Sequence, residues 1–457
     1  MCNYAQALAA GDLQDPETIS SRWITKDSLS KIALLLAALA TGAHFSVVQS
    51  PRNRLELCLD FIQRAFEALR LANFALHPRL DNVHALLIIG NTLQDCGQSD
   101  GSWVLLGTTI RLAEALGLHL QTSSSIPSNA GIQRSSALRD LLARQDCLLS
   151  ITLGRSAMVS GKWLSDPSVS NSTLLLPGDV MRNISRIALK IIDSDQKLNP
   201  DDCIKFLSDL DEADSHSELH LQRRDKCVNL QHHFDHLTIR LHLSFVASII
   251  CRPALTDSSR LRDDLQFTIL RNRAKQSLME TSRIFLDFHA LSLIPMRTWS
   301  ITHSVLCSTI LLCAWGETRD NPEVRTLQQR VVEAFSRAAK RGDEAGDEQE
   351  QRDPCKNTWL TTSHILALVA LQKTLHGSTL APPPGPAAEQ PQPRSSSQQQ
   401  QNPDAVYPEA DLTDFDFNFT TMLDESFRGQ TEEWPWEQTS LPPLEYLDAI
   451  MNGAAVV

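Results

Sequence analysis

The 457-residue sequence lacks the paired cysteines that small zinc domains and disulfide frameworks need. Its ten cysteines stand singly along the chain, and Cys307 and Cys313 are the closest pair. No CxxC motif occurs. This spacing argues against a zinc ribbon or finger and indicates buried thiols in a reducing compartment.

Glycine is also scarce, at 18 residues. We find no glycine-rich phosphate loop, no G-x-S-x-G elbow and no recognisable catalytic pairing of cysteine with histidine. The most apolar stretches, residues 32–43 and 305–315, are too short to span a bilayer. We therefore expect neither an enzyme nor a membrane partner, and we assign no catalytic, cofactor-binding or metal-binding residue.

The sequence carries no excess of basic charge. Its formal net charge is −12, and residues 404–457 hold twelve acidic residues and one arginine, a net of −11, so the first 403 residues carry about −1. The larger part therefore offers no broad basic field for nucleic acid. We expect that this chain by itself does not bind DNA with sequence specificity.

Apolar residues recur at helical spacing from residue 30 to about 375, without a run of period-two alternation. One stripe consists of Cys58, Phe61, Ile62, Ala65 and Leu69, and another of Trp103, Leu106, Ile110, Ala113 and Leu116. The pattern predicts an all-α fold, a large antiparallel helical array with a disordered linker and an acidic C-terminal tail.

Four segments follow from these patterns. Residues 1–29 form an N-terminal segment, and residues 30–375 form the helical domain. Residues 376–403 are rich in proline, glutamine and serine and predict a disordered linker. Residues 404–457 form the acidic and aromatic tail.

The most informative pattern lies within residues 68–160. Its residues are Trp103, Gly107, Arg111, Gly117 and His119, followed in the next helix by Asp146, Gly154 and Arg155. This pattern resembles the middle homology region of fungal zinc-cluster transcription factors, the fungal-specific transcription factor domain. The sequence departs from it at Arg139 and Asp140, where the family tends to have an aromatic pair, and at Ser156, where it tends to have proline.

The resemblance implies a pathway-specific regulator of transcription in the nucleus, with secondary metabolism among the pathways expected. Its relatives carry six cysteines that bind two zinc ions N-terminal to this region. Zinc is therefore expected only if such a cluster precedes the chain, and DNA only through a missing or partner DNA-binding domain. A small-molecule effector and a second copy in a dimer are further expected partners.

The same residues have a physical interpretation of their own. Trp103 on an apolar helical face predicts a core anchor, and Gly107 one turn later would permit close approach by a neighbouring helix. Arg111 and Arg155 would form a partly buried ion pair with Asp146 that fixes how two helices dock. We favour this structural role over ligand contact.

The tail interleaves aromatic residues with carboxylates. They are Phe415, Phe417, Phe419, Phe427, Trp434, Trp436 and Tyr446. Carboxylate repulsion keeps such a segment extended and its rings accessible, which is typical of an activation domain that coactivators capture in a hydrophobic groove. The alternative is a tail that only adds solubility.

Two polar clusters are candidates for a functional site. His232 and His236 are four residues apart, with His233 and Asp235 between them, but no glutamate follows the first histidine as a zincin requires. An acidic run near His216 and His220 comprises Asp211, Glu212, Asp214 and Glu218. We interpret the histidines as satisfied or exposed helix residues and the acidic run as a solvated loop or helix face. The alternative function is a helical interaction scaffold without DNA binding, which modulates an intact transcription factor.

Overall fold

The structure, a computed structural model, describes residues 25–120, 130–164, 174–194, 198–255, 265–292 and 294–343, with single residues and pairs between 364 and 375. The described residues form twelve α-helices and no strand, which confirms the all-α prediction. The predicted linker and tail lie outside the described residues.

The helices follow one another along the chain with short 3-10 turns between some of them. They are α3 (Lys26–Phe45), α4 (Pro51–Leu71), α5 (Leu80–Asp95), α6 (Ser99–Ala115), α7 (Ala130–Leu153), α8 (Pro177–Asp193), α9 (Pro200–Ser215), α10 (Leu219–Gln222), α11 (Leu230–Ile250), α12 (Leu265–Leu291), α13 (Trp299–Ala314) and α14 (Pro322–Asp343). The 3-10 turns used below are η2 (Leu118–Leu120), η3 (Gly161–Trp163) and η8 (Ile294–Arg297).

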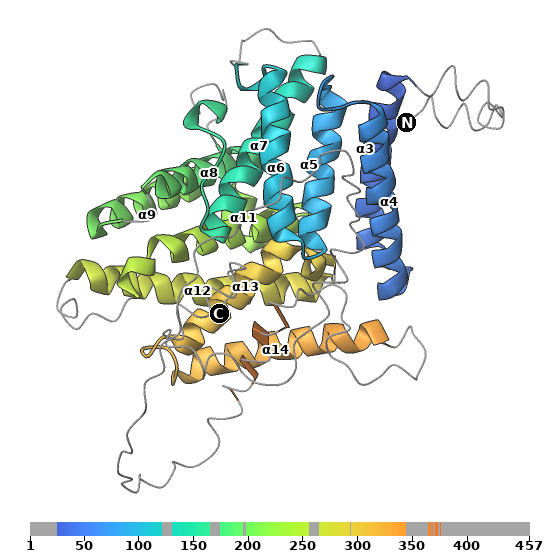
Figure 1. Cartoon of the computed structure of the whole chain (residues 1–457). Helices are drawn as coiled ribbons and strands as arrows, with labels where there is room; N and C mark the ends of the chain where they lie inside the picture. The colour runs from blue at the N-terminus through green and yellow to red at the C-terminus, as the bar shows by residue number, and fades with distance from the viewer. Residues whose placement is uncertain are drawn as a thin grey trace, which may run out of the picture. The chain divides into compact units, whose positions relative to one another are not determined.

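Each helix of the first part packs on its neighbour in sequence, α3 on α4 and α5, α5 on α6, α6 on α7 and α7 on α8. Figure 1 shows α3 to α7 side by side, with α12, α13 and α14 running across them. Two polar contacts join these parts over long sequence distances. The Trp299 backbone N–H donates to Asp95 Oδ1 at 2.9 Å, and Arg297 Nη1 donates to the Ser46 carbonyl at 2.8 Å.

Side-chain caps explain where several helices begin. The Ser50 hydroxyl accepts from the Asn53 N–H at 3.3 Å, with Pro51 as the first residue of α4. The Asn199 side chain accepts from the Asp202 N–H at 2.8 Å ahead of α9. Such caps satisfy backbone donors that have no partner in the first helical turn, each worth about 1 kcal/mol.

Two helices end at a glycine residue. Gly117 follows α6 with φ of 75°, and Gly154 follows α7 with φ of 65°. The Arg155 N–H then donates to the Ser150 carbonyl at 2.9 Å, closing the end of α7 in a Schellman arrangement. Glycine adopts this left-handed conformation without the steric cost of a Cβ atom.

An apolar cluster lies where α11, α12, α13 and α14 meet. Its aromatic members are Phe285, Phe288 and Phe335, all buried, and the Phe285 and Phe335 rings stack at 4.8 Å between centroids. We call these three residues, with the aliphatic side chains around them, the aromatic core. Each fully buried ring contributes roughly 1.5–3 kcal/mol relative to an exposed one.

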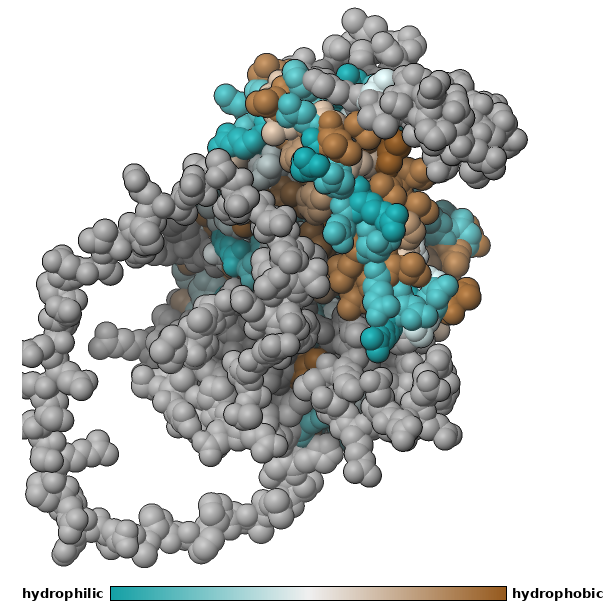
Figure 2. All heavy atoms as spheres, turned by 45° about the vertical axis from the view of Figure 1, so that its right-hand side comes forward, coloured by the Kyte–Doolittle hydropathy of each residue, from teal (hydrophilic) through white to brown (hydrophobic). Residues whose placement is uncertain are grey.

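Helix α3 is long and apolar enough to cross a membrane by length and composition. The apolar stretch that the sequence analysis considered, residues 32–43, is shorter than this helix, which extends beyond it at both ends. In the structure α3 packs along α4 and α5 and buries Ala33, Ala37 and Ala40. Figure 2 turns the right-hand side of Figure 1 forward and shows apolar and polar side chains interspersed on that face. Leu57 and Leu71 of α4 are exposed.

Candidate functional site

The residues that carried the sequence pattern gather where α6 meets α7 and the segment that follows it. Trp103 of α6 is half-buried, and its indole N–H donates to the Ser150 hydroxyl of α7 at 3.3 Å. The Arg155 guanidinium lies over the Trp103 ring, 5.0 Å from its centroid. We call this arrangement the α6–α7 corner.

Asp146 supplies the central polar contact of the α6–α7 corner. Its carboxylate is buried, and Oδ2 accepts from the backbone N–H groups of Met158 at 2.7 Å and Val159 at 2.8 Å. Burial raises the pKa of Asp146, while the two N–H donors and Ser150 act in the opposite direction. The side chain thus fixes the chain after α7 through hydrogen bonds to its backbone.

The ion pair expected between Asp146 and Arg111 or Arg155 is wrong. Arg111 is 69% exposed and pairs with Glu114 one turn along its own helix at 2.8 Å. Arg155 pairs with Asp100 at the start of α6. The helical register explains the first error, because it places Arg111 on the solvent face of α6, opposite buried Ile110 and Ala113.

Gly107 does not serve close packing as predicted. A Cβ atom added there would meet only Met158 Cγ, at 3.8 Å, an ordinary van der Waals distance. His119, in η2, instead makes an aromatic contact, stacking on Trp163 of η3 with ring centroids 6.2 Å apart. Four of the eight pattern residues therefore make contacts that join α6, α7 and the turns after them: Trp103, His119, Asp146 and Arg155. Gly117 and Gly154 follow the ends of the two helices, and Arg111 and Gly107 do neither.

An ion-pair network occupies the place where the sequence departs from the family pattern. The Asp140 carboxylate of α7 accepts from Arg182 of α8 at 3.1 Å, and Arg182 also donates to Asp179 at 2.8 Å. Arg139 is buried, with Nη2 3.5 Å from Asp140. Charged groups thus join α7 to α8 where aromatic packing was expected from relatives.

A cavity of about 300 Å³ lies among α11, α12, α13 and η8. Its wall is mostly apolar and includes Phe234, Leu241, Phe288 and Ile301, with hydroxyl groups of Thr238, Thr298 and Ser300. This size is at the lower end of the range for small-molecule sites, which are typically apolar with a few polar groups. Sequence patterns do not predict this cavity, because its residues follow the same helical stripes as core residues.

His242 adds a directional polar group to the wall of this cavity. Its Nδ1 lies 2.8 Å from the Thr238 carbonyl, and burial lowers the pKa of the ring. The neutral imidazole therefore donates from Nδ1 and keeps Nε2 as a hydrogen-bond acceptor.

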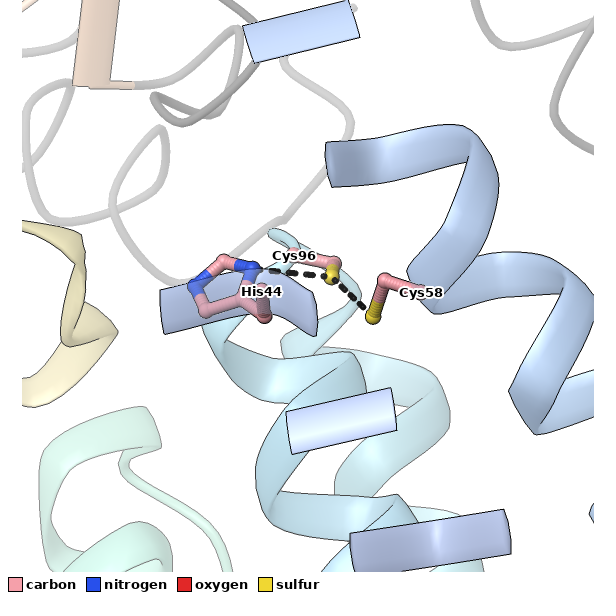
Figure 3. A group of neighbouring side chains, drawn as sticks. All are labelled: His44, Cys58 and Cys96. Atoms are coloured by element: carbon pink, nitrogen blue, oxygen red, sulfur yellow. Dashed lines mark hydrogen bonds between the residues drawn. The ribbon is translucent and has the colours of Figure 1, made fainter. Parts of the chain in front are cut away.

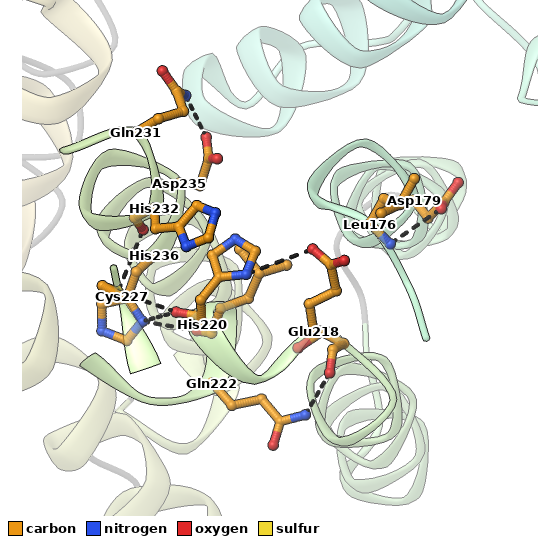
Figure 4. A network of polar contacts seen from close by, with 12 residues as sticks. Leu176, Asp179, Glu218, His220, Gln222, Cys227, Gln231, His232, Asp235 and His236 are labelled. Carbon is orange, nitrogen blue, oxygen red and sulfur yellow. Dashed lines mark hydrogen bonds and ion pairs between the residues drawn. The ribbon is translucent and has the colours of Figure 1, made fainter. Parts of the chain in front are cut away.

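The histidines near the start of α11 form contacts within the protein (Figure 4). His232 stacks on His220 with centroids 4.1 Å apart, and His236 Nδ1 donates to the Leu221 carbonyl at 2.9 Å. The pair at 232 and 236 therefore does not converge on a common ligand point. Among the described residues, the group of potential metal ligands lies elsewhere, at His44, Cys58 and Cys96.

Part of the acidic run is paired rather than freely solvated. Asp214 pairs with Arg240 of α11 at 2.5 Å, and Asp211 pairs with Arg273 of α12 at 2.5 Å. The run thus helps to dock α9 on α11 and α12, where a plain solvated surface was expected. Side chains separated by 26 and 62 residues in sequence meet here, which local spacing does not reveal.

Comparison with protein families agrees with the pattern at the α6–α7 corner. Residues 22–172 match the fungal specific transcription factor domain. This part of the chain is therefore similar to a domain of fungal transcription regulators. Searches of curated proteins and of solved structures give no match.

Proposed function

We propose that this protein is a pathway-specific regulator that acts in the nucleus through its helical domain and an activating acidic tail. The single observation that carries the proposal is the match of residues 22–172 to the fungal specific transcription factor domain. The composition of the tail adds to it, with seven aromatic and ten acidic residues within 411–457.

The tail is the part assigned to activation. Its acidic groups favour an extended chain, and its rings supply the apolar anchors that a hydrophobic coactivator groove requires. Residues 404–457 fused to an unrelated DNA-binding domain should activate a reporter gene. The matched variant replaces Phe415, Phe417 and Phe419 with alanine and keeps every charge.

Activation should fall several-fold in this variant, because the charges alone do not fill an apolar groove. Equal activity of the two fusions would show that the aromatic residues are dispensable. A silent parent fusion would remove the activation role altogether.

We assign the effector site to the cavity among α11, α12, α13 and η8. It suits a small, largely apolar molecule with a hydroxyl donor for His242 and a polar group for Thr298 or Ser300. Native mass spectrometry of protein isolated from fungal cells should show a bound small molecule. The Thr238→Trp variant, which fills the cavity, should lose it, and identical spectra would rule out this site.

DNA recognition and zinc are assigned to a six-cysteine cluster preceding this chain or to a partner that carries one. The nearly neutral charge of the first 403 residues favours this division. The same observation supports the scaffold alternative, in which the chain modulates an intact transcription factor. Dimerisation stays a prediction, with the exposed apolar side chains of α3 and α4 as the available surface.

A further inference from the structure

Three side chains meet where α3, α4 and the residue that follows α5 come together (Figure 3). His44 lies in the last turn of α3, Cys58 in the middle of α4, and Cys96 directly after α5. The distance from Cys58 Sγ to Cys96 Sγ is 3.8 Å, and that from Cys96 Sγ to His44 Nδ1 is 3.6 Å. All three ligand atoms lie within 4.8 Å of one another.

We propose that His44, Cys58 and Cys96 form a binding site for a single soft metal ion, Cu(I). Thiolate and imidazole are the ligands that soft and borderline ions prefer, which sets the site apart from an oxygen-rich Mg²⁺ or Ca²⁺ site. The inference concerns a property of the helical domain and is independent of the activating tail.

The distances suit a three-coordinate ion. With a metal–sulfur bond of about 2.3 Å and a metal–nitrogen bond of about 2.0 Å, trigonal geometry separates two sulfurs by about 4.0 Å and sulfur from nitrogen by about 3.7 Å. The two measured separations, 3.8 Å and 3.6 Å, are close to these values. The remaining pair, His44 and Cys58, closes with a side-chain shift of at most about 1 Å.

The histidine is held in the tautomer that a ligand needs. His44 Nε2 lies 3.2 Å from the Arg297 carbonyl, so Nε2 carries the proton and donates to that oxygen. Nδ1 is then the unprotonated nitrogen, and it faces the Cys96 thiol. A backbone carbonyl that fixes the distant nitrogen is a common support for a metal-binding histidine.

Two guanidinium groups lie near the site. Arg54 is buried and Arg297 is half-buried. Among the described residues neither guanidinium forms an ion pair; they donate to the carbonyls of Gln49 and Ser46. A Cu(I) ion with two thiolates carries one net negative charge, which these two cations would balance.

The number of donors selects Cu(I) over Zn(II). Structural Zn(II) sites almost always have four protein ligands, whereas the described residues bring three together here. Asp95 is adjacent in sequence, but its Oδ1 accepts from the Trp299 N–H. Metal binding would displace the thiol protons of the two cysteines and tie the ends of α3, α4 and α5 together.

The test is a titration of the purified, reduced 457-residue chain with Cu(I) in the absence of oxygen. A chelator that becomes coloured when it binds Cu(I) competes with the protein for the ion. Wild type should take up one tightly bound ion per chain. Cys58→Ser, Cys96→Ser and His44→Gln should each bind it more than about 100-fold more weakly, because each removes a direct ligand. The matched control is Cys203→Ser, which alters an equally buried cysteine in α9.

Melting temperatures separate loss of the site from loss of the fold. One equivalent of Cu(I) should raise the melting temperature of wild type and of the Cys203→Ser variant, and leave that of folded Cys96→Ser unchanged. If wild type and Cys96→Ser bind Cu(I) equally, the proposal is wrong. If one Zn(II) ion binds more tightly than Cu(I), the assignment of Cu(I) is wrong. If a disulfide between Cys58 and Cys96 persists under reducing conditions, the two thiols cannot bind a metal ion and the proposed site is wrong.

Discussion

The α6–α7 corner and the aromatic core both hold helices together, the first through hydrogen bonds and the second through apolar packing. At the corner, one buried carboxylate holds two backbone N–H groups, and a half-buried tryptophan lies under an arginine. In the aromatic core, stacked phenylalanines from α12 and α14 fill the interior without polar contacts between their side chains. The corner lies within the family-matched segment and the aromatic core lies beyond it.

This difference shows what a recognisable sequence pattern records. The hydrogen bonds that Asp146 accepts require one acceptor at one position, so few residues can replace it. An apolar core accepts many side chains of suitable volume, so its residues leave a weaker signature. The predictions that follow test this contrast, beginning with the largest expected effect.

The aromatic core should show the greatest single loss. Phe285→Ala removes a fully buried ring and leaves a cavity, so the free energy of unfolding should fall by about 3–5 kcal/mol. Urea denaturation followed by circular dichroism measures it. Leu265→Ala, in the same helix but 74% exposed, is the control and should change the value by less than about 0.5 kcal/mol. Similar losses in both variants would contradict the assigned packing of α12.

The corner should depend on one acceptor. Asp146→Ala leaves the N–H groups of Met158 and Val159 without their hydrogen-bond acceptor. The free energy of unfolding should fall by about 2–3 kcal/mol in the same denaturation experiment. Asp146→Asn keeps an amide oxygen at the position of Oδ2 and should lose less. If the asparagine variant is as unstable as the alanine variant, charge rather than hydrogen bonding holds the corner.

Acid should weaken the region around the aromatic core through buried histidines. His364 packs near Trp299 and His303, and burial lowers its pKa to about 3. Because the folded state resists protonation, the stability present above pH 6.5 is lost as the pH falls towards 3. From pH 7 to pH 5, His364→Gln should lose about 2 kcal/mol less stability than wild type.

The control for that comparison is His77→Gln, which alters an exposed histidine. It should follow the wild-type dependence of stability on pH. A His364→Gln variant with the wild-type dependence would show that His364 is not buried in its neutral form.

The smallest effect is expected at Arg111. An ion pair with Asp146 would have made Arg111 important for stability, but the side chain forms an exposed pair with Glu114. Such pairs contribute little, so the free energy of unfolding should change by less than about 0.5 kcal/mol. A loss above 1 kcal/mol in urea denaturation would restore a structural role for this arginine.

The sequence predicts the helical class because local periodicity and caps determine it. Buried Ile62, Ala65 and Leu69 follow the predicted stripe of α4, and Gly117 follows the end of α6. Contacts between distant residues are not encoded locally. For this reason Asp146 was placed beside the wrong groups, and the meeting of His44, Cys58 and Cys96 was missed.

The cysteine group illustrates this limit most clearly. Cys58 and Cys96 are 38 residues apart, and His44 is 52 residues from Cys96, so no short motif joins them. Only the packing of α3 against α4 and α5 brings the three side chains together. A search for closely spaced cysteines therefore excludes zinc fingers and leaves such a site undetected.

The central claim is that the helical domain regulates and the acidic tail activates. Two fusions to the same unrelated DNA-binding domain, one with residues 25–375 and one with residues 404–457, test it in one reporter strain at equal protein levels. The account predicts activation by the tail fusion and none by the helical fusion. Activation by the helical fusion with a silent tail fusion would contradict it.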